Sequence, residues 1–288
     1  MKNSLPTFTT KINFSPICTA TPADITALHA IWRAAFGESS AYIRFVLSQA
    51  LSLGRVLWIP EGCSCLTLFP LTLYVSLEKP TSYKGFYVYG VATHPDFQGQ
   101  GFASALLRYA ATLPADFLLL YPAQPDLVAY YAARGFTLGV AVPPSAHPGG
   151  GCSEGPEGSG RSEGPGHSED PDGSGCPEGP ERAGRLGLEA LSGSYARYLR
   201  EVPAAYPYAF LWPEPLFKFA WEECLERGGY TSDCALHFPD TNQVKPYLPT
   251  KAASEQPSEA LLQWLAPHSP FSQKPISVEN SFFGLPLD

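Results

Sequence analysis

One short segment limits the possible folds of this chain more than any other. A strand-like run, residues 85–93, leads through a glycine-rich turn into a helix-like run, residues 103–111. The turn contains Gly99 and Gly101, and glycine lets the backbone approach a ligand closely. The first N–H groups of a helix have no partner inside the helix, so they can bind an anion. The segment is therefore a candidate phosphate site between a strand and a helix.

The segment alone leaves other interpretations open. A turn with two glycines before a helix also occurs in plain loops, and Ser104 stands where a dinucleotide fingerprint needs a third glycine. The next segment of the chain favours the phosphate-binding interpretation. A second strand-like run, residues 117–122, precedes a helix-like run that ends Tyr131-Ala-Ala-Arg-Gly135-Phe136. Glycine commonly ends a helix in the left-handed conformation, so we expect the helix to stop at Gly135 and a strand to follow.

The two segments together resemble motifs A and B of the GCN5-related N-acetyltransferase (GNAT) superfamily. Gln98, Gly101 and Ala103 occupy the specified positions of motif A, Gln/Arg-x-x-Gly-x-Gly/Ala, and residues 131–136 match motif B, Tyr-x-x-x-Gly-Phe. The resemblance covers roughly residues 20–142. It implies an α/β (α+β) fold with a mixed, splayed central sheet, whose fourth and fifth strands run parallel and separate at one end.

The resemblance also implies a cofactor and its binding residues. Acetyl-CoA would be the co-substrate, with no metal. Its pantetheine arm would hydrogen-bond the backbone near Val91, Ala92 and Thr93. Its pyrophosphate would be held by the motif A loop, which comprises Gln98, Gly99, Gln100, Gly101, Phe102 and Ala103.

Acetyl transfer to an amine also needs proton transfers, and the resemblance offers two neighbouring tyrosines as candidates for one of them. Tyr131 matches the tyrosine that protonates the departing thiolate in many GNAT enzymes, and Tyr130 beside it is a second candidate. A tyrosine in an aromatic-rich helix can equally belong to the core. The function expected is therefore an N-acetyltransferase that acts on a primary amine by direct attack through a tetrahedral intermediate. The alternative is a non-catalytic acyl-CoA-binding module.

The general base cannot be read from the sequence, because residues 87–91 contain no carboxylate. Tyr87 and Tyr89 could relay a proton through water, although we expect both to face the core. His94 is expected to satisfy local backbone groups rather than to titrate. In GNAT relatives of the enhanced-intracellular-survival type, the chain's own C-terminal carboxylate enters the active site, which would be Asp288 here.

Local patterns predict the elements of residues 1–142, which would form the acetyl-CoA-binding domain. Thr21 is a good N-cap, and Gly37 a good helix stop, for an apolar stripe at helical spacing. A helix over 41–53, two strands over 55–59 and 63–77, and a strand over 84–93 follow. The remaining expected elements are a helix over 101–112, a strand over 116–121, a helix over 125–134 and a strand over 136–142.

The composition changes abruptly after this domain. Residues 143–185 are rich in Gly, Pro, Ser and Glu and nearly lack apolar side chains, which predicts a disordered linker or insertion. The segment contains eight acidic and three basic residues, so it carries −5 of the formal net charge of −8. The remaining −3 gives no support to binding of nucleic acid or of an anionic membrane.

Order is expected again over residues 186–288, which we interpret as a smaller, degenerate second GNAT-like lobe. The segment 206–212 should be extended, 213–229 a helix with a glycine stop, and 261–265 a short helix. The arrangement loosely resembles two-lobed GNAT proteins of the enhanced-intracellular-survival type.

The remaining features predict an ordinary intracellular protein. Seven cysteines without zinc spacing are expected to be free thiols, and Cys63 and Cys65 should point to the same side of one strand. No apolar block typical of a signal peptide or a membrane helix is present, so a cytoplasmic location is expected. The acceptor would be a small amine or a peptide amine, and the oligomeric state cannot be predicted.

Overall fold

A computed structural model describes residues 16–61, 63–76, 80–140, 183–241, 243–249, 259–265 and 281–282. For residues 138–140, 183–190, 259 and 281 only the backbone is considered. The predicted linker, residues 143–185, therefore lies almost entirely outside the described residues, and so do Cys152, Cys176 and Asp288. The described residues resume at Ala183, where helix α5 begins.

The first helices form where the caps predict them. A 3-10 turn, η1 (Pro22–Asp24), leads into α1 (Ile25–Phe36), and the carboxylate of Asp24 accepts the backbone N–H of Thr21 at 2.8 Å. Gly37 ends α1 in the left-handed conformation with φ 73°. The side chain of Ser39 then caps α2 (Ser40–Leu53). These contacts confirm the predicted boundaries to within a residue or two.

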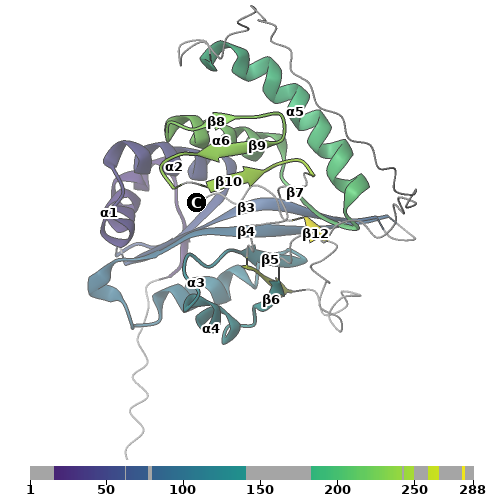
Figure 1. The fold of residues 1–288 in the computed structure, drawn as a ribbon. Helices are drawn as coiled ribbons and strands as arrows, with labels where there is room; N and C mark the ends of the chain where they lie inside the picture. Colours follow the sequence, from purple (N-terminus) through teal and green to yellow (C-terminus); the bar gives the residue numbers. More distant parts are fainter. Residues whose placement is uncertain are drawn as a thin grey trace, which may run out of the picture.

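The described strands form a mostly antiparallel, nine-stranded sheet (Figure 1). The main order is β1-β2-β3-β4-β5-β11-β6, while β7 pairs with the far half of β3 and β12 pairs with β7. Among the described strand pairs, only β4–β5 and β12–β7 are parallel. The strands are β1 (Cys18–Thr19), β2 (Arg55–Ile59), β3 (Ser64–Val75), β4 (Thr81–Thr93), β5 (Phe117–Leu120), β6 (Thr137–Val140), β7 (Tyr208–Leu211), β11 (Glu259–Trp264) and β12 (Ser281–Phe282).

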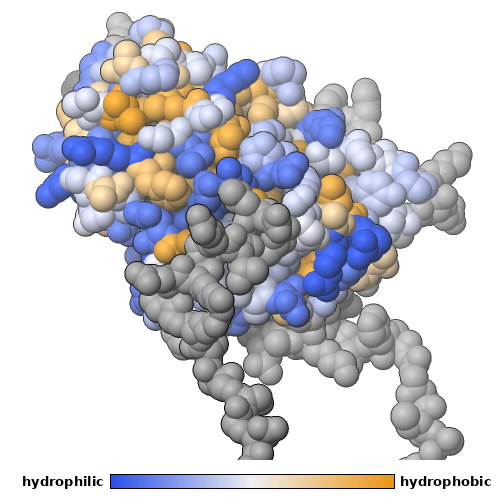
Figure 2. Space-filling model, turned by 90° about the horizontal axis from the view of Figure 1, so that it is seen from above, coloured by the Kyte–Doolittle hydropathy of each residue, from blue (hydrophilic) through white to orange (hydrophobic). Residues whose placement is uncertain are grey.

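Helices cover both faces of this sheet (Figure 1). On the upper face in that view lie α1, α2 and α6 (Glu214–Glu226), and on the lower face lie α3 (Phe102–Ala110) and α4 (Leu127–Ala132). Beside the upper layer are α5 (Ala183–Ala205) and a three-stranded antiparallel sheet of β8 (Tyr230–Thr231), β9 (Ala235–Phe238) and β10 (Gln243–Pro246). Seen from above, hydrophobic residues are interspersed with hydrophilic ones (Figure 2).

Two apolar cores follow from this layering. The upper core, between the sheet and α1, α2 and α6, includes Leu28, Trp32, Val46, Phe69, Tyr87, Tyr89, Trp212 and Phe219. The lower core, between the sheet and α3 and α4, includes Leu57, Leu66, Val88, Phe102, Leu106, Leu118, Tyr131 and Phe136.

The predicted helix over residues 261–265 is wrong, because this segment is strand β11. It lies antiparallel between β5 and β6, with Leu261 opposite both Leu120 and Leu138. Leu261 belongs to the lower core and Leu262 to the upper core. A strand buried on both faces is apolar without alternation, so its sequence cannot be distinguished from that of a short helix.

The second half of the chain therefore contributes directly to the main sheet. Strands β7, β11 and β12 all come from residues beyond 186 and pair with strands of the first half or with one another. The apolar contacts are continuous as well, since the upper core contains residues of α2 and of α6. The domain boundaries at 142/143 and 185/186 stay predictions.

Candidate active site

The parallel pair β4–β5 separates at one end. The two strands pair only where Gly85–Tyr87 face Phe117–Leu119, whereas β4 continues to Thr93. Within this unpaired part, the register with β3 shifts by one residue at Gly90, which has φ 58°. A Cβ on Gly90 would come within 2.9 Å of Trp32 Cη2 and closer still to Cζ2, so glycine is needed for both reasons. This register shift is a β-bulge. It sets the direction of the backbone from Val91 onward, at the end of β4.

The end of β4 is fastened to β3. The hydroxyl of Ser64 donates to the carbonyl of Ala92 at 2.8 Å and lies 2.9 Å from the hydroxyl of Thr93. The backbone N–H of His94 donates to the carbonyl of Cys63 at 2.8 Å. Because the carbonyl of Ala92 is engaged by β3, Val91 and Thr93 are the better placed of the three predicted residues to offer backbone groups to a ligand.

The glycine-rich turn has the geometry that the sequence predicts. The 3-10 turn η2 (Pro95–Phe97) is capped by the ring of His94, whose Nδ1 accepts the N–H of Asp96 at 3.3 Å, as expected for that histidine. Gly99 and Gly101 have φ 75° and 86°, values that other residues rarely adopt. No side-chain hydrogen bond caps α3, which begins directly after Gly101. Residues 98–101 are exposed, so the uncapped helix end faces solvent.

An arginine that the sequence analysis did not single out links α3 to the end of α4. Arg134 donates to the hydroxyl of Ser104, in the first turn of α3, through Nε at 2.9 Å and Nη2 at 2.7 Å. It also donates to the carbonyl of Tyr130 and stacks on that ring, with Cζ 3.3 Å from the centroid. The guanidinium therefore adds positive charge beside a helix N-terminus that is already partly positive.

Tyr131 lies on α4 and points into the lower core. Its side chain is 7% exposed, and its ring packs edge-on against Phe136 at 5.8 Å between centroids. Burial raises the pKa of the Tyr131 hydroxyl to about 12, while the nearby charge of Arg134 opposes the shift. Phe102, of the predicted loop, belongs to the same core, and Val91 packs against it. The structure thus brings residues of both motifs together around one cluster.

The two tyrosines of β4 face the opposite side of the sheet. Tyr87 packs edge-on against Trp212 at 5.0 Å, and Tyr89 packs against Trp32 and Phe69 in the upper core. The hydroxyl of Tyr89 hydrogen-bonds that of Tyr42 on α2, and Tyr42 donates to Oε1 of Glu223 at 2.5 Å. The expected burial of Tyr87 and Tyr89 is therefore confirmed.

Glu223 is a site residue that the sequence analysis missed. Its side chain is 1% exposed although it carries a carboxylate. A signal was present, because Glu223 falls at helical spacing within the apolar stripe of α6 that contains Leu216 and Ala220. A charge inside such a stripe must be paired or hydrogen-bonded when the helix packs.

Other candidate groups have plain structural roles. Cys63 and Cys65 are buried free thiols, and burial raises the pKa of Cys65 to about 12. The expectation that they share a side is wrong, because Cys63 precedes β3 and joins the lower core while Cys65 joins the upper core. Within the described residues, no cluster of His, Cys, Asp or Glu could hold a metal ion, and no helix could span a membrane.

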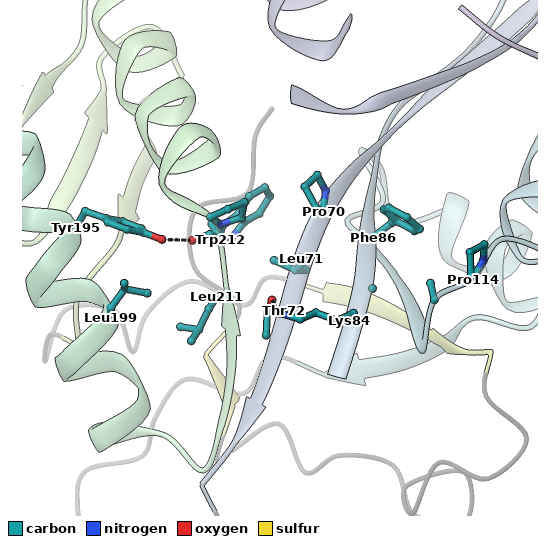
Figure 3. A pocket seen from close by; sticks show the side chains of 13 residues that line it. Pro70, Leu71, Thr72, Lys84, Phe86, Pro114, Tyr195, Leu199, Leu211 and Trp212 are labelled. Carbon is teal, nitrogen blue, oxygen red and sulfur yellow. Dashed lines mark hydrogen bonds between the residues drawn. The ribbon is translucent and has the colours of Figure 1, made fainter. Parts of the chain in front are cut away.

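A pocket of about 430 Å³ lies elsewhere, between the paired ends of β3 and β4 and the C-terminal half (Figure 3). Its walls include Leu71, Lys84 and Phe86 on one side and Leu199 and Trp212 on the other. None of the predicted site residues lines it.

Comparison with family models gives a match to the first half of the chain. Residues 16–139 match the family model described as "Acetyltransferase (GNAT) domain". Both motifs that the sequence suggested lie within the matched residues, and the expected mixed α/β fold is confirmed. The loose likeness to survival-type, two-lobed proteins is not supported by any match. No protein with a curated description matches this chain in sequence.

Several solved structures are similar to parts of the chain. A GCN5-related N-acetyltransferase from Kribbella flavida is 13% identical over 88% of this chain and 65% of its own, with a TM-score of 0.47. A GNAT-family acetyltransferase from Brucella melitensis, solved with acetyl-CoA, is 19% identical over 42% of this chain and 82% of its own, with a TM-score of 0.31. A conserved protein of unknown function from Enterococcus faecalis is 16% identical over 43% of this chain, with a TM-score of 0.34, and only 32% of its length is spanned.

Proposed function

We propose that this protein is an acetyl-CoA-dependent N-acetyltransferase. The observation that carries the proposal is the open end of the β4–β5 pair, where two left-handed glycines and an uncapped helix N-terminus meet. In this proposal the backbone of residues 98–103 binds the pyrophosphate of CoA. The pantetheine arm lies along Val91 and Thr93, and Ala92 lines the same stretch of β4. The solved Brucella relative was crystallised with acetyl-CoA, which is consistent with this choice.

The proposed reaction is direct transfer to a primary amine. The amine nitrogen attacks the thioester carbonyl carbon, a tetrahedral intermediate forms, and the C–S bond breaks. Tyr131, with a pKa of about 12, is a weaker acid than a thiol, whose pKa is near 8.5. Full transfer of its proton to the thiolate is therefore uphill, and we assign its phenol a hydrogen bond to the developing negative charge on sulfur. The acceptor class, a small amine or a peptide amine, and a cytoplasmic location remain part of the proposal.

The test combines binding with turnover. Calorimetry should show binding of CoA to the full chain, and Gly101→Glu should abolish it, because a carboxylate would stand where the phosphates sit. Release of free thiol from acetyl-CoA is then measured over a panel of small amines and peptide N-termini. Binding of CoA without amine-dependent thiol release would refute the proposed activity. Unchanged affinity in a folded Gly101→Glu protein would refute the cofactor site.

One observation favours the alternative, a non-catalytic acyl-CoA-binding module. Tyr87 and Tyr89 are 2% and 4% exposed, so aromatic side chains fill the upper face of β4 near the open end. An amine that approached from this face would have to displace them or bind at their edge. The same turnover assay separates the two functions, since the alternative predicts tight CoA binding with no acceptor.

A further inference from the structure

A chain of hydrogen bonds crosses the upper core from the C-terminal half to the open end of β4. Glu223, on α6, accepts the hydroxyl of Tyr42 at 2.5 Å, and Tyr42 hydrogen-bonds Tyr89. The single O–H of Tyr42 is used toward Glu223, so its oxygen must accept from Tyr89. All the donors thus point one way, from β4 toward the carboxylate.

We propose that Tyr89, Tyr42 and Glu223 form a proton relay that takes the proton of the acceptor amine during acetyl transfer. This inference rests on the proposed N-acetyltransferase function and deepens it, since it supplies the general base that β4 itself lacks. Tyr89 is the catalytic residue of the relay, and Tyr42 and Glu223 act through it.

The position of Tyr89 relative to Tyr131 supports this assignment. Tyr89 lies two residues beyond the last residue of β4 that pairs with β5, so it stands at the mouth of the gap between the strands. It faces the upper core, whereas Tyr131 faces the lower core. The two side chains therefore lie on opposite faces of the sheet, and the proposal requires the amine to reach Tyr89 from the gap. A thioester in the gap would meet a donor for its sulfur on one side and an acceptor for the amine proton on the other.

The charges around Glu223 suit a terminal base. Arg227, one turn further along α6, holds its Cζ 5.9 Å from the centroid of the Tyr42 ring, and Lys245 of β10 is 5% exposed. Both cations lie close enough to Cys224, the neighbour of Glu223, to oppose the rise in the pKa of that thiol. The proposal requires Glu223 to be ionised, since only the carboxylate can receive a proton, and a nearby cation would favour that form. Arg227 is itself paired with Asp240, with 2.7 Å between Nη2 and Oδ2.

The proton movements balance without any further reactant. As nitrogen attacks the thioester, its proton passes to Tyr89, the hydroxyl proton of Tyr89 passes to Tyr42, and that of Tyr42 passes to Glu223. Burial and the carboxylate raise the pKa of both tyrosines well above the usual value, so neither is left as a phenolate. Glu223 must return its proton to solvent before the next turnover, and Tyr42 is the most exposed member of the relay.

The experiment compares two neighbouring glutamates of α6. Glu223→Gln removes the base of the relay. Glu222→Gln is the matched control, because Glu222 also accepts a hydrogen bond from α2, from Gln49 at 3.5 Å, but lies outside the relay. Turnover at saturating acetyl-CoA and amine is measured from pH 6 to pH 10, and Tyr42→Phe serves as a second variant that leaves both glutamates in place. Thermal melting of each variant is the control that it is folded.

We expect Glu223→Gln and Tyr42→Phe each to lower turnover about 10²–10⁴-fold near pH 7, with Glu222→Gln unchanged. The loss should shrink toward pH 10, where solvent deprotonates the amine, and the double variant should be no slower than either single one. If the hydrogen bonds only held α2 and α6 together, the variants would lower the turnover rate by the same factor at every pH. That result, or equal rates for the two glutamate variants, would overturn the relay while leaving the acetyltransferase proposal standing. A wild-type protein that binds CoA but acetylates no amine would overturn both.

Discussion

Gly90 is the position where a single methyl group should disturb the site most directly. Gly90→Ala forces a non-glycine residue to φ 58°, which costs about 1–2 kcal/mol. The new Cβ would also overlap the indole of Trp32, which is 3% exposed and has no free space to move into. Overpacking of this kind costs about 1–3 kcal/mol. Together these terms predict a loss of about 2–5 kcal/mol in the free energy of unfolding.

Gly37→Ala provides the matched control for this measurement. Gly37 has φ 73°, and a Cβ there meets nothing within 4 Å. The control therefore carries the backbone cost alone, about 1–2 kcal/mol. Urea unfolding followed by circular dichroism should place Gly90→Ala about 1–3 kcal/mol below Gly37→Ala, if steric overlap is the second term.

A second substitution tests the source of the difference. In the Gly90→Ala background, Trp32→Phe removes part of the indole that the methyl group meets, so the two changes should couple favourably. Affinity for CoA should also fall in Gly90→Ala but not in Gly37→Ala, because the bulge directs Val91 and Thr93. Equal stability of the two alanine variants would refute the argument that close approach of Trp32 requires glycine.

Two further predictions concern α4. Tyr131→Phe keeps the ring in the lower core and removes the donor, so turnover should fall about 10²–10³-fold while CoA affinity measured by calorimetry stays constant; a constant rate would make Tyr131 a core residue only. Arg134→Gln should weaken CoA binding about tenfold at low salt and less at high salt, because a charge beside the helix N-terminus is lost. Arg108→Gln, at the exposed far end of α3, is its control and should leave the affinity unchanged.

The helices and strands that could be predicted from the sequence are those whose ends are set by neighbouring residues. The cap at Thr21 and Asp24, the left-handed Gly37 and the glycine pair before α3 each act within a few residues, so the boundaries of the first half are nearly right. In motif B, Gly135 is a left-handed glycine with φ 90° as expected, but α4 already ends at Ala132, two residues before the predicted end at residue 134. Within the site, the loop and Tyr131 could be found from such patterns.

The rest depends on contacts between distant segments. Arg134 is unremarkable in the sequence, because Ser104, which it binds, lies thirty residues earlier on another helix. Glu223 becomes meaningful only when α6 packs against α2 and brings it to Tyr42. The sequence shows Glu223 as a charge within an apolar stripe, but it does not show which residue Glu223 contacts, so the proposed base had to come from the structure.

Strand β11 shows most clearly why the two halves of the chain must be considered together. The match to the GNAT family model ends at residue 139, yet β6 pairs with the sheet only through β11, as far as the described residues show. The side chain of Gln263 on β11 also donates to the carbonyl of Arg134 at 3.3 Å. The segment that positions α4, and with it Tyr131, therefore comes from more than a hundred residues later in the chain. Because α6 of the same half brings Glu223 to Tyr42, the C-terminal half supports both faces of the candidate site.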